Sequence, residues 1–186
     1  MGQDDAARTQ RFEELMLPHA EAVYRTAYYL VGGQEAEDLT QETYLKAYQA
    51  FDQFRGPNAK AWLCAILRHA FLDHCRRRRH ELPFVPLELG APAGDRGEAR
   101  APSAEEQVLD GQLDGDVQSA LRALPDEWRL VLLLADVEDL TYREIAEVTQ
   151  VPIGTVMSRL CRARRRLRDH LGEYARRAGH AVEHAG

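Results

Sequence analysis

The sequence has few cysteines and no long apolar run, and each shortage excludes a class of protein. Cys64, Cys75 and Cys161 show none of the C-x-x-C spacing that binds zinc. Cys64 and Cys75 would lie about 16 Å apart on one helix, too far for a disulfide, so we expect buried, reduced thiols. No stretch reaches the roughly 20 apolar residues of a membrane span, and the first residues show no basic-then-apolar signal segment. We therefore expect a cytoplasmic protein that holds no metal and no cofactor.

Strand patterns are also almost absent, and apolar residues recur at helical spacing nearly throughout, which predicts an all-α fold. Residues 81–113 are rich in proline, glycine and acids. Such a composition cannot bury a core and indicates a flexible acidic linker. The sequence thus predicts two small helical domains, residues 1–80 and 114–172, and a tail at 173–186 that frays. The expected helices span about 10–31, 34–52, 58–79, a segment from 113, 126–137 and a final helix-turn-helix.

Positive charge is concentrated in two places although the whole chain is acidic. The formal net charge is −6 at pH 7, yet arginines cluster at Arg76–Arg79 and within Arg159–Arg168. Local clusters of positive charge matter more for nucleic-acid binding than overall charge does. The two clusters are therefore candidate DNA-binding segments, one on each side of the linker.

The pattern of a helix-turn-helix is contained in residues 140–168. Thr141 and Glu144 have the spacing of a capping box, with Leu140 placed to pack on Ile145 across it. A turn at 150–151 follows, and Pro152 stands at or near the start of the second helix. The sequence therefore predicts two short-linked helices, the second of which would enter a DNA major groove.

The second helix of this pair divides into two faces. Val156, Leu160, Ala163 and Leu167 form one apolar stripe at spacings of four, three and four. The opposite face carries Met157, Ser158, Cys161, Arg162 and Arg165. Residues 154–168 contain six arginines and no carboxylate, so we expect arginines that are free to meet a polyanion.

The third predicted helix carries a second polar stripe. Trp62, His69, Asp73 and Arg76 recur at spacings of seven, four and three. Aromatic and guanidinium groups can stack bases and bind phosphates, and the preceding loop FRGPN, residues 54–58, could hold an extruded base. The alternative is that Trp62 is core and that the arginines form a solvated helix end. This helix alone does not decide between the two.

Three segments, taken in order, carry a family resemblance. They are AEDLTQETYLKAYQAFDQFR at 36–55, AWLCAILRHAFLDHCRRRRH at 61–80 and LPDEWRLVLLLADVEDLTYREIAEVTQVPIGTVMSRLCRARRRL at 124–167. They resemble the polymerase-binding segment, the −10 reader and the −35 reader of extracytoplasmic-function sigma factors of bacterial RNA polymerase, especially the stress-response members. A helix-turn-helix is shared by many regulators, but all three segments in this order are highly specific.

The resemblance implies a promoter-specificity subunit that acts with core RNA polymerase, is controlled by an anti-sigma factor and performs no enzymatic chemistry. The acidic linker would thread the polymerase interior. The first domain would dock on the clamp coiled coil of the largest subunit. By motif position, the docking residues are Asp38, Leu39, Gln41, Glu42 and Lys46.

The resemblance also implies which residues read each promoter element. The −10 element, with a non-template base flipped into a pocket, would be bound by Phe54, Arg55, Asn58, Trp62, His69, Asp73, Arg76 and Arg77. The −35 bases would be met by Met157, Ser158, Cys161 and Arg162, and the phosphates by Thr155, Arg159 and Arg165. Arg162 is the strongest candidate for base readout, because guanidinium can bridge O6 and N7 of guanine. Many relatives carry Asn in place of His69 and Arg in place of Met157, so base preference is expected to differ there.

Two other functional classes are weaker. A free-standing helix-turn-helix regulator of an operator would need a dimerisation surface, and no heptad or further domain supplies one. An enzyme could use His69, Asp73, His74 and Cys75, but adjacent residues point to different helix faces and no metal-ligand or nucleophile–base spacing supports it.

Overall fold

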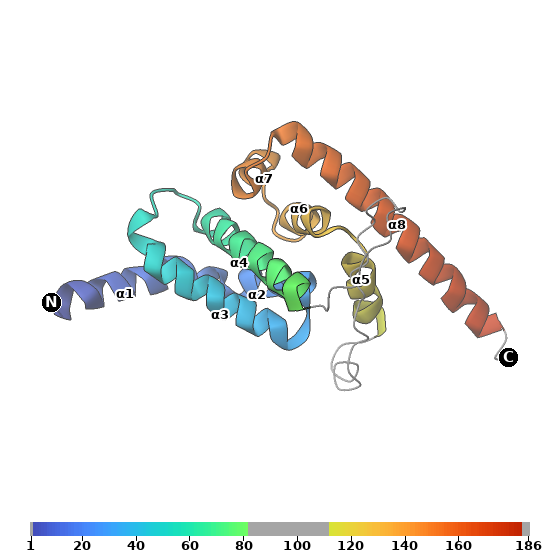
Figure 1. The fold of residues 1–186 in the computed structure, drawn as a ribbon, viewed down its shortest axis with the longest axis horizontal. Helices are drawn as coiled ribbons and strands as arrows, with labels where there is room; N and C mark the ends of the chain where they lie inside the picture. Colours follow the sequence, from blue (N-terminus) through green and yellow to red (C-terminus); the bar gives the residue numbers. More distant parts are fainter. Residues whose placement is uncertain (1, 82–111, 184–186) are drawn as a thin grey trace.

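The computed structural model describes residues 2–81 and 112–183, and every regular element in those ranges is a helix (Figure 1). The prediction of an all-α fold is confirmed, and the predicted linker lies almost wholly outside the described residues. No helix in the described ranges is long and apolar enough to cross a membrane. The helices, including two 3₁₀ turns named η, are α1 Gly2–Met16, η1 Leu17–His19, α2 Ala20–Val31, α3 Gly33–Ala50, η2 Phe51–Gln53, α4 Ala59–Glu81, α5 Gln112–Arg122, α6 Asp126–Asp136, α7 Tyr142–Thr149 and α8 Ile153–Glu183.

The first domain packs α2, α3 and α4 around one apolar core. Val23 and Leu30 of α2, and Leu63 and Leu67 of α4, are at most 1% exposed. One prediction here is wrong, because the expected helix over 10–31 is two helices broken at Pro18. Proline lacks the N–H that a helix interior needs, and it stands at the start of the 3₁₀ turn η1.

The second domain folds as the local sequence predicts. The capping box of Thr141 and Glu144 is formed in both directions, and Gln150 ends α7 in the left-handed region at φ 54°. Val156, Leu160 and Ala163 are at most 2% exposed. The last helix is longer than predicted, since α8 continues to Glu183 through a sequence with many strong helix formers.

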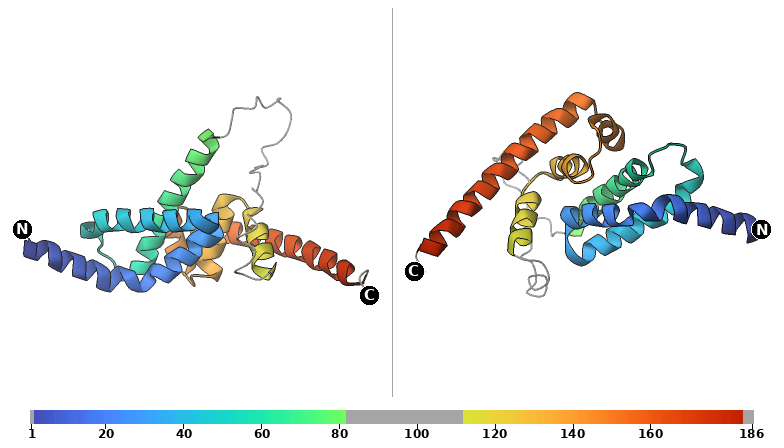
Figure 2. Two further views of the ribbon diagram at one scale, coloured as in Figure 1. Left: turned by 90° about the horizontal axis from the view of Figure 1, so that it is seen from below. Right: turned by 180° about the vertical axis from the view of Figure 1, so that it is seen from behind.

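The two domains lie against each other, which the sequence did not predict. Figures 1 and 2 show α4 beside α7 and α2 beside α5 and α6, and inter-helix contacts join the same pairs. At the end of α2, Arg129 Nη1 donates to the Leu30 carbonyl at 2.7 Å and Gln118 Nε2 to the Tyr28 carbonyl at 3.3 Å. These donors satisfy carbonyls that a helix C-terminus leaves without partners. Gly32, at φ 83°, ends the helix where Arg122 approaches too closely for a Cβ.

Candidate nucleic-acid interface

The outer face of α8 is open to solvent. Met157 is 54% exposed, and Ser158, Cys161, Arg162 and Arg165 are exposed as predicted. No carboxylate among the described residues lies within ion-pair distance of Arg162 or Arg165. Because the apolar stripe is anchored in the domain core, this side of α8 presents two guanidinium groups and a thiol in fixed positions.

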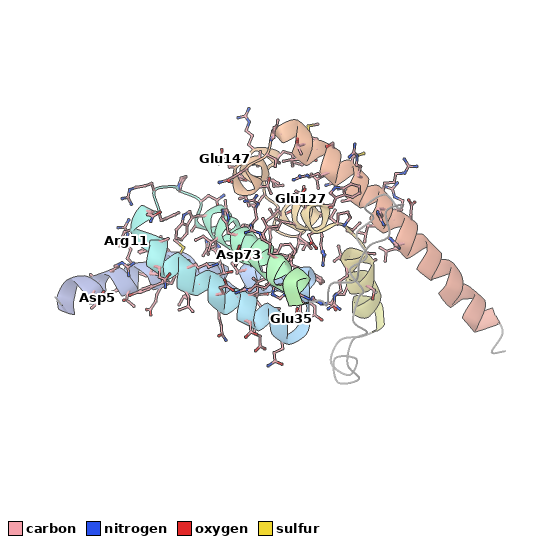
Figure 3. All side chains as sticks on the ribbon, in the orientation of Figure 1. Asp5, Arg11, Glu35, Asp73, Glu127 and Glu147 are labelled. Carbon is pink, nitrogen blue, oxygen red and sulfur yellow. The ribbon has the colours of Figure 1, made fainter. Side chains whose placement is uncertain are left out.

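Two other arginines of α8 are not free, contrary to the expectation from the sequence. Arg159 pairs with Glu127, and Arg164 pairs with Asp136 through two nitrogens. Both acids belong to α6, and Figure 3 shows Glu127 beside α8. Residues 154–168 carry no acid of their own, and the acids that pair with these arginines are brought by packing from a neighbouring helix. Arg159, a predicted phosphate contact, is consequently 19% exposed.

The aromatic groups near the start of α4 form a small cluster. Phe54 stacks on Phe51 with ring centroids 6.4 Å apart and an interplanar angle of 10°, and its ring lies 5.2 Å from that of Trp62. Phe54 and Trp62 are half-buried. Trp62 is therefore neither wholly core nor wholly surface: one side packs and the other can meet a ligand. His69 is exposed on α4.

Some of the predicted DNA-binding and polymerase-binding residues of the first domain share one ion-pair network. Arg77 donates to Glu42 at 3.0 Å, Lys46 pairs with Glu42 at 2.8 Å and with Asp73 at 3.5 Å, and Arg76 pairs with Asp73 at 3.3 Å. Partial burial opposes ionisation of Glu42, but hydrogen bonds from Lys46 and Arg77 lower the pKa of Glu42 on balance. The network links the outer face of α3 to the stripe on α4 (Figure 3 labels Asp73).

The docking residues predicted on α3 do not all share one surface. Asp38 and Gln41 are exposed, whereas Leu39 is 2% exposed and lies in the core. Leu39 therefore supports the helix and contributes nothing to the outer face. The spacing of Leu39, Thr43 and Ala47, all buried, could have identified it. Leu45 on the same helix is 65% exposed, so the outer face of α3 also carries an apolar side chain.

Asn58 is held between the two domains. Its Oδ1 accepts from the Ala61 N–H at 3.0 Å, which caps α4, and its Nδ2 donates to Glu144 of α7. The hydroxyl and N–H of Thr141 contribute most to lowering the pKa of Glu144, and Asn58 adds to the effect. A predicted −10 contact is thus occupied by the other domain.

A buried acid, Glu138, occupies the same interface. Its side chain is fully buried, and Oε1 accepts from Thr26 at 3.0 Å and from Arg25 at 3.1 Å. Lys60 Nζ lies 3.9 Å from Oε2, which accepts no hydrogen bond within the described residues. Sequence reasoning missed Glu138, because its three partners come from the other domain.

The three thiols differ in exposure. Cys64 is buried as expected, Cys75 is half-buried, and Cys161 is exposed on the outer face of α8. Burial raises the pKa of Cys64 to about 12, so its thiol is the least reactive of the three.

Comparison with known proteins gives consistent matches in both domains. The models of Sigma-70 region 2 and Sigma-70, region 4 match residues 15–81 and 114–167. The ECF RNA polymerase sigma factor SigE of Mycolicibacterium smegmatis is 39% identical over 92% of this chain, which spans 65% of the length of SigE. The RNA polymerase sigma-H factor of Pseudomonas aeruginosa is 35% identical over 70% of each chain. The sigma factor RpoE of Bartonella quintana, solved in complex with the anti-sigma factor NepR, superposes with a TM-score of 0.69 at 30% identity, over 88% of this chain and 98% of that chain.

Proposed function

The chain belongs to the extracytoplasmic-function sigma factors of the sigma-70 family, and from that membership we propose that it binds core RNA polymerase and directs transcription initiation at specific promoters. The observation that carries the proposal is the presence of both regions in order, each with its own helix that bears DNA-compatible side chains. The energy for strand separation would come from binding rather than from covalent chemistry.

The −35 element would be read by the outer face of α8. Arg162 is exposed and unpaired among the described residues, so it can reach the O6 and N7 of guanine, and Ser158 lies one turn earlier. Met157 and Cys161 would contact thymine methyl groups. Thr155, Arg165 and, once it leaves Glu127, Arg159 would bind phosphates.

The −10 element would be bound by the stripe on α4 and the loop before it. Trp62 and Phe54 form an aromatic platform for a flipped non-template base, and base–aromatic stacking contributes about 1–3 kcal/mol per base. His69 would contact a neighbouring base. Arg55 and Asn58 in the loop, and Asp73, Arg76 and Arg77 further along α4, would bind the separated strand.

Polymerase docking would use the outer face of α3. Asp38 and Gln41 are exposed there, while Glu42 and Lys46 lie half-buried in the network that reaches α4. A basic partner surface on the polymerase clamp would compete with Arg77 for Glu42.

The contact between the two domains would have to open for this function. The two promoter elements are centred about 25 base pairs apart, on the order of 85 Å at 3.4 Å per base pair. In the structure α4 touches α7, the helix next to the −35 reader. One conformer of this kind cannot reach both elements, so we propose that it is a closed form and that polymerase binding separates the domains.

The closed form also suggests how the protein would be kept inactive. A structural relative, RpoE, was solved with an anti-sigma factor. We propose that this chain likewise has an anti-sigma partner, which would hold the domains in a form unable to engage the promoter. The inducing signal would act on the anti-sigma partner, which would then dissociate and let the domains separate.

The direct test is in vitro transcription with core polymerase on a library of promoter fragments. Specific initiation that needs both this protein and core supports the proposal. A palindromic footprint from the protein alone, with no stimulation of core, would support an operator-binding regulator instead.

A further inference from the structure

The N-terminal helix α1 makes contacts that the promoter-reading role has not used. The region 2 model begins at residue 15, so most of α1, Gly2–Met16, precedes it. In Figure 1 the helix extends away from the second domain and runs beside the end of α3. Its side chains contact the end of α3 and the turn η2. This turn leads into the loop at residues 54–58, which we call the −10 loop.

Arg8 holds the end of α3 and the turn η2 together. Its Nη2 donates to the Tyr48 carbonyl at 2.6 Å, one of the last carbonyls of α3, and its Nε donates to Asp52 Oδ1 in η2 at 3.1 Å. The guanidinium also lies 4.5 Å from the centre of the Tyr48 ring. One side chain thus satisfies a helix end, an acid of the following turn and an aromatic face.

A continuous series of ring contacts runs from α1 to the −10 loop. Phe12 is 7% exposed and meets Tyr48 and Phe51 edge-to-face, at 5.1 and 5.2 Å between centroids. Phe51 stacks on Phe54, and Phe54 contacts Trp62. The two rings proposed to receive the flipped base are therefore linked to α1 through Phe51.

We infer that α1 is a positioning element for the −10 base pocket, with Arg8 and Phe12 fixing η2 so that Phe54 and Trp62 stand ready for the extruded base. Neither residue touches DNA. The inference rests on the proposed sigma-factor function and assigns a role to residues that precede the region 2 match. Preorganisation matters here, because unpairing a base costs a few kcal/mol and a platform that must first be ordered offsets less of that cost.

The test uses the full chain with core polymerase and the variants Arg8→Gln and Phe12→Leu. Gln10→Ala is the matched control, because Gln10 lies on the same helix and donates only to Glu14. Each protein is compared on an intact promoter and on promoters with single abasic sites in the non-template −10 strand. Open complexes are measured by 2-aminopurine fluorescence, and core affinity is measured in parallel.

On the intact promoter we expect Arg8→Gln to lower open-complex formation about tenfold, the size of one lost charge-assisted hydrogen bond, with core affinity unchanged. One abasic position will lower open-complex formation by the wild type most, and it marks the base that the pocket binds. On that promoter the wild type and Arg8→Gln should form open complexes equally well, because the pocket then has no base to bind. Asp52→Asn should reproduce part of the effect and add nothing to Arg8→Gln. Arg8→Lys is expected to restore open-complex formation only in part, because one ammonium group cannot make both hydrogen bonds of the forked guanidinium.

Two results would overturn the inference. One is an equal abasic penalty in wild type and Arg8→Gln, which would mean that Arg8 acts on stability alone. The other is a full-strength open complex in both Arg8→Gln and Phe12→Leu. A wild-type protein that opens no promoter with core would instead refute the proposed function, so the two failures are distinguishable.

Discussion

The two helices that carry candidate DNA-binding residues, α4 and α8, are held in different ways. On α8 the apolar face is fixed in its own domain, and Arg162 and Arg165 stand exposed on the other side. On α4 the polar stripe is engaged by α3 through Glu42 and Lys46. The loop before α4 is engaged by the second domain, where Asn58 donates to Glu144. Apart from Arg159, which pairs with Glu127, the proposed −35 surface is therefore open in the free chain, whereas the proposed −10 surface depends on what α4 is bound to.

This difference suggests a division of labour between the two domains. A preformed surface can locate a site on duplex DNA, and we expect the surface that captures single-stranded bases to be withheld until polymerase is present.

The replacement of Asp38 and Gln41 together by Ala should reduce core binding by about 100-fold, since two polar contacts to a charged partner are lost. Transcription should fall with it, while binding of the −35 duplex by the free chain stays unchanged. Titration of core with labelled protein gives the affinity. Glu37→Ala, at an exposed neighbouring acid, is the control, and an affinity that survives the double change would show that docking uses another face.

The change Glu138→Ala should open the domain interface. Breaking a buried ion pair costs about 3–5 kcal/mol, but Arg25 and Lys60 are partly exposed and can regain water, so about 2 kcal/mol, or roughly 30-fold toward the open form, is expected. The free chain should then bind single-stranded −10 DNA more tightly and −35 duplex as before. Glu147→Ala, at an exposed acid of α7, should do neither (Figure 3). An equal gain in affinity for single-stranded −10 DNA and for −35 duplex would show that the two DNA-binding surfaces do not differ in this way.

The change Arg162→Ala should relax preference at one −35 base pair by about tenfold, the 1–3 kcal/mol range of a bidentate guanine contact. The −10 preference should not move. Arg164→Ala is the matched control, because Arg164 is an arginine of the same helix that pairs with Asp136 of α6. Binding selections on randomised −35 duplexes give the measurement, and an unchanged preference would remove Arg162 from base readout.

The smallest effect concerns Glu144, which joins the capping box of α7 to Asn58. Its pKa is lowered below the ordinary value of 4.5, so its contribution to stability is present above that pH and is lost as the pH falls through the lowered pKa. Glu144→Ala should cost about 1 kcal/mol at pH 7, as loss of a helix cap does, and the cost should shrink as the pH falls through the lowered pKa. Thermal unfolding across this range gives the comparison. If the loss of unfolding free energy persists in acid, Glu144 stabilises the protein by packing rather than by its charge.

The parts of the structure that the sequence predicted are those set by local interactions. The capping box at Thr141 and Glu144, and the apolar stripe through Val156 and Leu160, depend on residues within two turns of each other. The helix break at Pro18 also had a local signal, which the prediction of one helix over 10–31 ignored.

The missed features depend on residues far apart in the chain. Arg159 meets Glu127 across 32 positions, and Arg25 meets Glu138 across 113. No periodicity reports such pairs, because they arise when one helix packs on another. The candidate site residues could be named from motifs, but whether each is free or occupied could not.

The most direct test of the account is the distance between the domains, measured by pulsed EPR between spin labels at Glu14→Cys on α1 and Arg166→Cys on α8. Cys75 and Cys161 are replaced by Ser, and the buried thiol of Cys64, with its pKa raised to about 12, stays unlabelled. We expect a single distance, that of the closed form, in the free chain, and a longer one in the complex with core and promoter. A transcriptionally active complex that keeps the distance of the free chain would contradict the account.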